Sequence, residues 1–114
     1  MIPAHIATLV YTIPAVTGAI AATRFVGFDD AQAGVDAAVQ GVSKTDAATG
    51  EPLAIIGIGI VEMVAATAIA KGAKVYSDAN GQPAATGGAT SNNPAGTAIR
   101  AAAAPGDIVT LIIR

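Results

Sequence analysis

The longest hydrophobic run of the chain spans residues 53–70, where Glu62 is the only charged side chain. Its length approaches the ~20 residues with which a helix crosses a bilayer. However, Gly57 and Gly59 each disfavour a helix by ~1 kcal/mol, and a charge near the centre of a span costs at least ~2 kcal/mol. Eight of the 18 residues are β-branched, which favours extended structure. The pattern therefore predicts a long soluble strand that ends near Val64, and no membrane partner.

Alternation along this strand assigns its side chains to two faces. One face is aliphatic apart from a single carboxylate, and we expect it to pack in the core: Ile56, Ile58, Ile60, Glu62 and Val64. Glu62 would then lie at the exposed end of the strand or in a contact between subunits. The opposite face carries Gly57 and Gly59, which leave a bare strip where another backbone can pack closely.

Six more β-branched runs lie between turn signals that recur about every eight to twelve residues. These runs are residues 9–13, 24–28, 38–42, 73–77, 97–99 and 107–113. Short strands at this spacing indicate a small all-β sandwich or barrel, and Asn80-Gly81 supplies the clearest hairpin turn. Residues 29–39 and 99–104 have the composition of short helices. The predicted fold is mainly β, a small barrel-like domain with one or two short helices.

The two halves of the chain resemble each other. Residues 19–30 align without gaps on residues 68–79, an offset of 49. Two glycines match at slightly larger offsets, 55 and 56: Gly41 with Gly96, and Gly50 with Gly106. An aliphatic strand follows the second glycine of each half. The pattern predicts two similar β units that close one barrel with approximate two-fold symmetry, with the long hydrophobic run at their junction.

The composition indicates that the hydrophobic core of a single chain buries little area. The 114 residues are enough for one domain, and 53% of them are hydrophobic, but 28 are alanine, which buries little area. The chain has no cysteine, so no disulfide reinforces the fold. Small domains with thin cores commonly gain stability by oligomerisation. We therefore expect the protein to self-associate.

The candidate chemistry is sparse. A net charge of −2 and 4% aromatic residues provide no surface for nucleic acid. His5 is the single histidine and lies in a terminal segment, so neither a hydrolytic triad nor a histidine metal site is predicted. Asp29, Asp30 and Asp36 lack the spacing of a calcium loop and are interpreted as a solvated turn. No Walker-type phosphate loop occurs. We expect no catalytic residue, metal or cofactor, and a non-enzymatic protein.

The N-terminal segment, residues 1–14, is predicted to be an arm that precedes a single domain of residues 15–114. Strand-forming residues lie between Pro3 and Pro14 and place apolar side chains on both faces. Such a strand can pair with the sheet edge of another chain, where main-chain hydrogen bonds provide the affinity. Alternatively, it is an ordinary edge strand of its own domain. The sequence leaves both interpretations open.

Five segments in a fixed order carry a family resemblance: LVYTIPA, RFVGFDDAQA, VQGVSKTDAATGE, GIVE with AIAKGAKVYSDANGQ, and PAGTAIRAAAAPGDIVTLIIR. From about Leu9 to Arg114 the chain resembles the small bacteriophage capsid decoration, or cement, proteins of the β-tulip type, which are related to lambda-type head decoration proteins. The resemblance implies a homotrimer on the outer surface of an icosahedral head, bridging neighbouring major capsid subunits at three-fold or quasi-three-fold positions. It implies no catalytic residues.

By the same analogy, the arm adds a strand to elements of the major capsid protein. The implied capsid-binding residues are Ile2, Pro3, His5, Ile6, Thr8, Leu9, Val10, Tyr11 and Thr12. One rival from another class is a barrel-sandwich carrier domain of the lipoyl or biotinyl kind, which would suit the internal repeat and place a modified lysine at Lys44. The modification signature expected around that lysine is absent.

Overall fold

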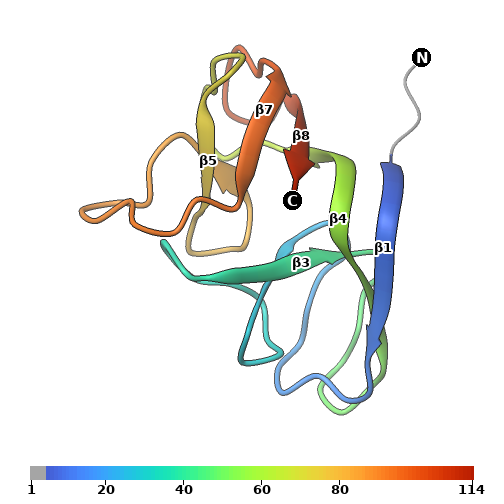
Figure 1. The fold of residues 1–114 in the computed structure, drawn as a ribbon. Coiled ribbons are helices and arrows are strands. Elements are labelled where there is room, and N and C mark those ends of the chain that lie inside the picture. The colour runs from blue at the N-terminus through green and yellow to red at the C-terminus, as the bar shows by residue number, and fades with distance from the viewer. Residues whose placement is uncertain (1–4) are drawn as a thin grey trace.

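The computed structural model describes residues 5–114 and shows eight strands in one strongly curved, nearly closed sheet (Figure 1). The strands are β1 (His5–Ile13), β2 (Phe25–Gly27), β3 (Val39–Ser43), β4 (Leu53–Val64), β5 (Lys74–Ser77), β6 (Pro83–Ala84), β7 (Gly96–Arg100) and β8 (Ile108–Ile113). Their order in the sheet is β2-β3-β4-β8-β7-β5-β6, and β1 also pairs with β4. The fold is mainly β and barrel-like, as the sequence predicts.

All seven predicted runs contain a strand, and Asn80-Gly81 lies in the turn that joins β5 to β6. The expected short helices are wrong, because residues 5–114 contain no helix. Residues 29–39 form turns around Gly34 before β3 begins, and residues 99–104 belong partly to β7 and partly to a loop. Ala102 in that loop pairs with Ile69, which explains its extended backbone. In the described chain no helix is long and apolar enough to span a membrane.

β4 is the central strand of the sheet. Antiparallel β1 covers one edge of β4 along residues 53–61. The other edge is shared, because β3 pairs with residues 55–56 and β8 with residues 59–64. The long hydrophobic run is therefore a strand that ends at Val64, as predicted, and it serves both halves of the molecule.

The predicted assignment of the two faces of β4 is wrong beyond Ile56. Ile56 is buried as expected, but Ile58 and Val64 are exposed, whereas Val61 and Met63 are in the core. The change occurs at Gly57, which is an extra residue of β4, because Ile56 and Ile58 on either side of it pair with the consecutive residues Val10 and Leu9 of β1. A one-residue shift of this kind exchanges the inward and outward faces of a strand.

The predicted repeat is confirmed by the strand registers. We define unit 1 as residues 5–58 and unit 2 as residues 59–114; Figure 1 shows β3 in the lower part, and β5, β7 and β8 together above it. Corresponding pairs occur in both units: Phe25–Val42 with Lys74–Thr97, Val26–Gly41 with Val75–Gly96, and Ile20–Ala47 with Ile69–Ala102. Between the units, the first residue of each pair is shifted by 49 positions and the second by 55, which are the two offsets found in the sequence repeat. The two units therefore share one local topology.

The matched glycines Gly41 and Gly96 lie where two strands approach most closely. A β-carbon on Gly41 would lie 2.5 Å from the carbonyl oxygen of Ile56, and one on Gly96 would lie 2.7 Å from that of Ile112. No real β-carbon tolerates such distances. Absence of a side chain is therefore required at the same point of both units.

Buried side chains form two clusters that follow the repeat. The smaller cluster belongs to unit 1 together with its strand β1: Ile13, Val16, Ile20, Val26, Ala47, Leu53 and Ile55. Every member has its counterpart in the larger cluster: Met63, Ala65, Ile69, Val75, Ala102, Val109 and Leu111. The larger cluster also contains Phe25, Ala33, Val42 and Ile56 of unit 1. It is thus both the core of unit 2 and the contact between the units.

Candidate functional site

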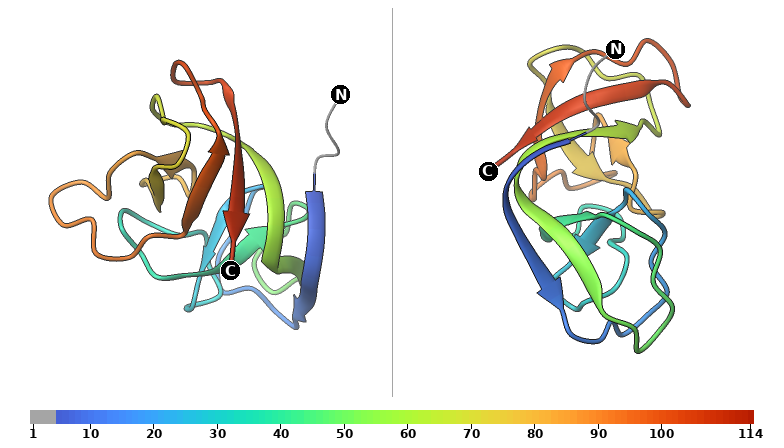
Figure 2. Two further views of the ribbon diagram at one scale, coloured as in Figure 1. Left: turned by 45° about the horizontal axis from the view of Figure 1, so that its top comes forward. Right: turned by 90° about the vertical axis from the view of Figure 1, so that its right-hand side faces the viewer.

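β1 is the most accessible strand of the molecule. In the described part of the chain it pairs with β4 alone, and both views in Figure 2 show it running alongside β4 at the margin of the sheet. Its side chains from residue 9 to residue 12 are all exposed, and Ile13 is the first buried one. Exposed fractions of 45% at Leu9 and 43% at Val10 are high for large apolar side chains.

Two bulges explain why apolar side chains of β1 face solvent. The register between β1 and β4 shifts on both sides of Leu9, so consecutive residues do not alternate regularly between core and solvent. Ile58, the β4 partner of Leu9, is exposed as well. We call Leu9, Val10, Tyr11 and Ile58 the β1 strip. A strip of large apolar side chains beside an open sheet edge is typical of a protein–protein contact.

Tyr11 fixes β1 to the body of unit 1. Its hydroxyl donates to Gln40, at 2.8 Å from Oε1 and 3.3 Å from the carbonyl oxygen. Burial, with a smaller contribution from the Asp30 carboxylate, raises the pKa of Tyr11 above its usual value. The ring also lies over Gly57, since a β-carbon there would be 3.0 Å from Cε1 of Tyr11. The Leu9 side chain and the backbone carbonyl oxygen of Gln40 lie 3.5 and 3.7 Å from the same position, so both side chains and backbone approach this part of the predicted glycine face.

The other predicted arm residues are placed only in part. Ile2 and Pro3 lie outside the described residues. The backbones of His5, Ile6 and Thr8 lie in β1, where His5 is opposite Val61 and Ile6 is opposite Ile60. Leu9, Val10 and Tyr11 are brought together with Ile58, which the sequence had assigned to the core. Thr12 is exposed beside them. In this single chain residues 5–13 of the predicted arm pair with β4 of their own domain.

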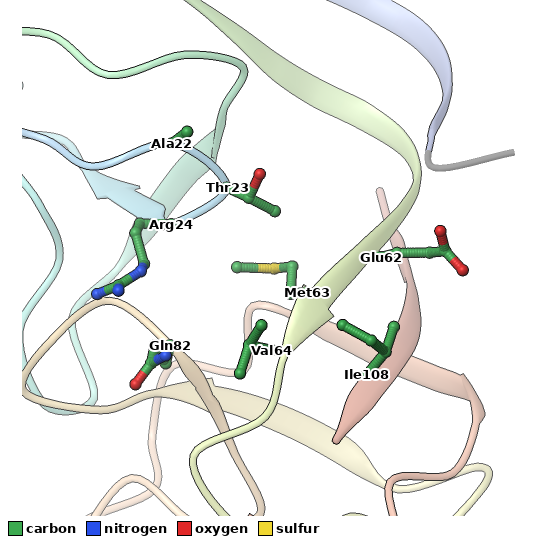
Figure 3. Close-up of a pocket in the computed structure, with 8 residues that line it drawn as sticks. All are labelled: Ala22, Thr23, Arg24, Glu62, Met63, Val64, Gln82 and Ile108. Carbon is green, nitrogen blue, oxygen red and sulfur yellow. The ribbon is translucent and has the colours of Figure 1, made fainter. Parts of the chain in front are cut away.

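A pocket of about 540 Å³ lies at the junction of the two units (Figure 3). Ala22, Thr23 and Arg24 of unit 1 form one wall, and the end of β4 faces the start of β8. Figure 3 shows Arg24 and Glu62 on opposite sides of Met63, with Val64 and Ile108 below it in this view. Arg24 Nη1 donates to the carbonyl oxygen of Asn80 at 2.8 Å. The recess has the size and mixed polarity for an inserted side chain.

Asp36 corrects one sequence interpretation, because it is not part of a solvated turn. The carboxylate is buried and accepts hydrogen bonds from the backbone N–H groups of Asn92 and Asn93, each at 2.8 Å, and from the Thr90 hydroxyl. These donors, the Asn92 N–H first, hold the pKa of Asp36 below its usual value. No sequence motif indicated this contact, because its partners lie more than fifty positions away.

The two units differ in length at the loop that binds Asp36. The offset between the units grows from 49 to 55 between β2 and β3, so unit 2 has six more residues here. The loop before β7 accommodates them, and Thr90, Asn92 and Asn93 of this loop bind Asp36 of unit 1. The loop therefore joins the two units. Among residues 5–114, no group of three His, Cys, Asp or Glu side chains is arranged to hold a metal ion.

Comparison with solved structures shows the same fold in a phage protein. The N base of the head fiber gp8.5 of bacteriophage phi29 matches with a TM-score of 0.70 and 19% sequence identity, over 93% of both chains. No curated protein matches the sequence significantly. The model of the phage cement protein family matches residues 4–113, almost the whole chain.

The family match places this all-β domain in a class, the structural proteins of phages, and the phi29 protein shows the same fold. Within that class, the chain belongs to the phage cement protein family. The resemblance inferred from the sequence is thereby confirmed at the level of the family.

Proposed function

We propose that the protein is a decoration protein that binds the outside of an assembled icosahedral phage head as a homotrimer and cements neighbouring subunits of the major capsid protein. Membership of the cement family supports the association with a head. The observation that carries the proposal is the open edge of β1 with its exposed apolar strip. We further propose that the protein is not an enzyme.

The open edge suits addition of a strand from the capsid. A capsid segment that extends the sheet along β1 would satisfy the main-chain N–H and C=O groups of that edge, which provides affinity independent of sequence. The β1 strip would then contribute specificity by burying Leu9, Val10 and Ile58. Because binding is restricted to the folded, assembled state, each occupied site also stabilises the decoration protein and the head by mass action.

Deleting residues 2–12 tests this proposal. The described side chains removed are all exposed, and Ile13 of the smaller core cluster is retained, so we expect the truncated domain to remain folded. We expect co-sedimentation with undecorated heads to be abolished. Circular dichroism and thermal melting would establish folding of the truncated protein. Undiminished co-sedimentation would contradict the proposed role of β1.

A point variant avoids large changes to the chain. Replacing both Leu9 and Val10 with serine keeps the strand but removes apolar area, and we expect it to weaken head binding at least tenfold. Val35→Ser is the matched control, because Val35 is an apolar residue of unit 1 outside β1 that is even more exposed, at 55%. Equal head binding by the Leu9/Val10 variant and the control would argue against the strip. The family membership favours this function over a carrier domain with a modified Lys44, which an intact-mass measurement would reveal.

A further inference from the structure

Phe28 is the most exposed large apolar side chain of the described chain, at 72%. The other phenylalanine, Phe25, is completely buried. Phe28 is followed directly by Asp29, also exposed, and by Asp30. Aromatic side chains are enriched at protein–protein contacts, so the exposed ring is a candidate anchor, and the two carboxylates add a charge that a partner would have to match. We call residues 28–30 the Phe28 tip.

The Phe28 tip is held rigidly. Asp30 N–H donates to the carbonyl oxygen of Gly27 at 3.1 Å, and the Thr17 hydroxyl donates to that of Asp29 at 2.7 Å. Gln40 Nε2 donates both to the Gly27 carbonyl oxygen and to Oδ1 of Asp30, at 2.7 and 2.8 Å. A turn fixed in this way loses little conformational entropy when it binds. The exposed ring is therefore a preorganised anchor.

The opposite charge lies on unit 2. Five of the eight acidic residues belong to unit 1, and four of the six basic residues belong to unit 2. Strand register places Lys74, Thr97 and Ile112 in one row across β5, β7 and β8, and Arg114 follows on the same face of β8. Lys74, Thr97, Ile112 and Arg114, with Pro94, line a pocket of about 180 Å³. We call this the basic pocket.

The internal repeat indicates that the face of unit 2 that carries the basic pocket is a surface for packing against another unit. Its row of Lys74, Thr97 and Ile112 is the counterpart of the row Phe25, Val42 and Ile56 in unit 1. In unit 1 that row is buried in the contact with unit 2. In unit 2 the same row is exposed or half-buried, so none of residues 5–114 covers it completely. A unit 1 from another molecule could cover it.

Charge disfavours the pocket of Figure 3, and the repeat distinguishes the basic pocket from a third pocket, which is lined by Lys71 and Arg100 and lies outside the row. The pocket of Figure 3 has Glu62 on one side, which would repel Asp29, and its Arg24 already donates to Asn80. The basic pocket offers two cations, which attract carboxylates and also favour the face of an aromatic ring. Its apolar lining, Pro94 and Ile112, suits the ring itself.

We propose that the Phe28 tip of one subunit inserts into the basic pocket of a second copy of this chain. The contact joins two different surfaces, so it is heterologous and can be repeated around a ring. This inference rests on the self-association proposed above, and it specifies the surfaces that make the trimer. Phe28 fills the apolar part of the pocket, and the carboxylate of Asp29 lies between Lys74 and Arg114.

Oligomeric mass of the full chain tests the proposal, by light scattering after size-exclusion chromatography and by sedimentation velocity over a range of concentrations. We expect the unmodified protein to assemble and Phe28→Ser, Asp29→Asn and Lys74→Glu each to raise the dissociation constant at least tenfold. Asp29→Asn keeps the acceptor for the Ala31 N–H, so its turn remains formed. Val35→Ser and Ile108→Ser are matched controls that remove other exposed apolar side chains and should leave assembly unchanged.

A charge exchange provides the sharper test. Asp29→Lys and Lys74→Glu should each prevent assembly, whereas an equimolar mixture of the two, or the double variant, should recover it. A monomeric wild-type protein at all concentrations, or folded single variants that assemble like wild type, would overturn the inference. Normal assembly with lost head binding in Phe28→Ser would assign the tip to the capsid instead, which overturns this inference and leaves the proposed function standing.

Discussion

At Gly41 and Gly96 the fold requires a residue that has no β-carbon. Each lies at a crossing where the neighbouring carbonyl oxygen occupies the place of a β-carbon. Glycine in a strand normally weakens it, so its presence at equivalent points of both units reflects close approach rather than flexibility. The sequence match between these two glycines was therefore a sign of structure that composition alone would not reveal.

We expect Gly41→Ala and Gly96→Ala each to lower the free energy of unfolding by about 1–3 kcal/mol, the cost of overpacking. The added methyl group would collide with backbone, which cannot move as a side chain does. Urea denaturation would measure the change. Gly34→Ala is the control, since a β-carbon there has no neighbour within 4 Å. Equal stabilities for Gly41→Ala and Gly34→Ala would contradict the close approach.

At the scale of elements, the strand β1 divides into two parts with different roles. Residues 9–12 are exposed and rely on pairing with β4 and on the Tyr11 hydroxyl, whereas Ile13 enters the smaller core cluster. The strand is therefore anchored mainly at its C-terminal end. An element attached in this manner can present its outer edge to a partner without weakening the core.

This division predicts unequal effects of two alanine substitutions in the same strand. Ile13→Ala should lower the free energy of unfolding by about 2–5 kcal/mol, because it leaves a cavity in the core. Val10→Ala should change it by less than about 0.5 kcal/mol, as is usual for surface positions. Denaturant titrations of the two variants would provide the comparison. A large loss of stability in Val10→Ala would show that the exposed part of β1 contributes to the fold.

The elements also show where sequence reasoning succeeds and where it fails. β-branched runs between turns located seven strands, because local propensity and pattern suffice for short strands bounded by glycine and proline. Alternation failed in β4, because the extra residue at Gly57 depends on pairing with β1, a strand far away in sequence. The alanine-rich residues 99–104 suggested a helix, but pairing of Ala102 with Ile69 determines their conformation.

At the scale of the molecule, two similar units are held together by one large core cluster and by the contact around Asp36. The loop of unit 2 binds the carboxylate with two backbone N–H groups and a hydroxyl. Gly87 lies against this side chain so closely that a β-carbon would be 2.7 Å from its Cγ. This contact links the units by charge-dependent hydrogen bonds, so the whole molecule acquires a dependence on pH.

Because the folded pKa of Asp36 is lowered, the ionised carboxylate stabilises the native state. That contribution is complete above the unfolded pKa of about 3.9 and is lost as the pH falls through the lower folded value. We expect Asp36→Asn to melt at a lower temperature than wild type at pH 7 and to lose less stability on acidification. Melting curves from pH 7 to pH 3 would show this, with Glu62→Gln on the outer face of β4 as the control. Parallel curves for wild type and Asp36→Asn would refute it.

The central position of β4 has a consequence for the speed of folding. Residue 5 pairs with residue 61, and residue 59 pairs with residue 113, so both ends of the chain must find its middle. Contacts between such distant residues require the chain to close large loops, and the entropy cost of closing them precedes the favourable contact energy. Domains dominated by such contacts therefore fold in milliseconds to seconds. During that time the chain exposes an aliphatic segment whose two edges are unpaired. Early covering of β4 therefore lowers the chance that two newly made chains pair with each other through this segment.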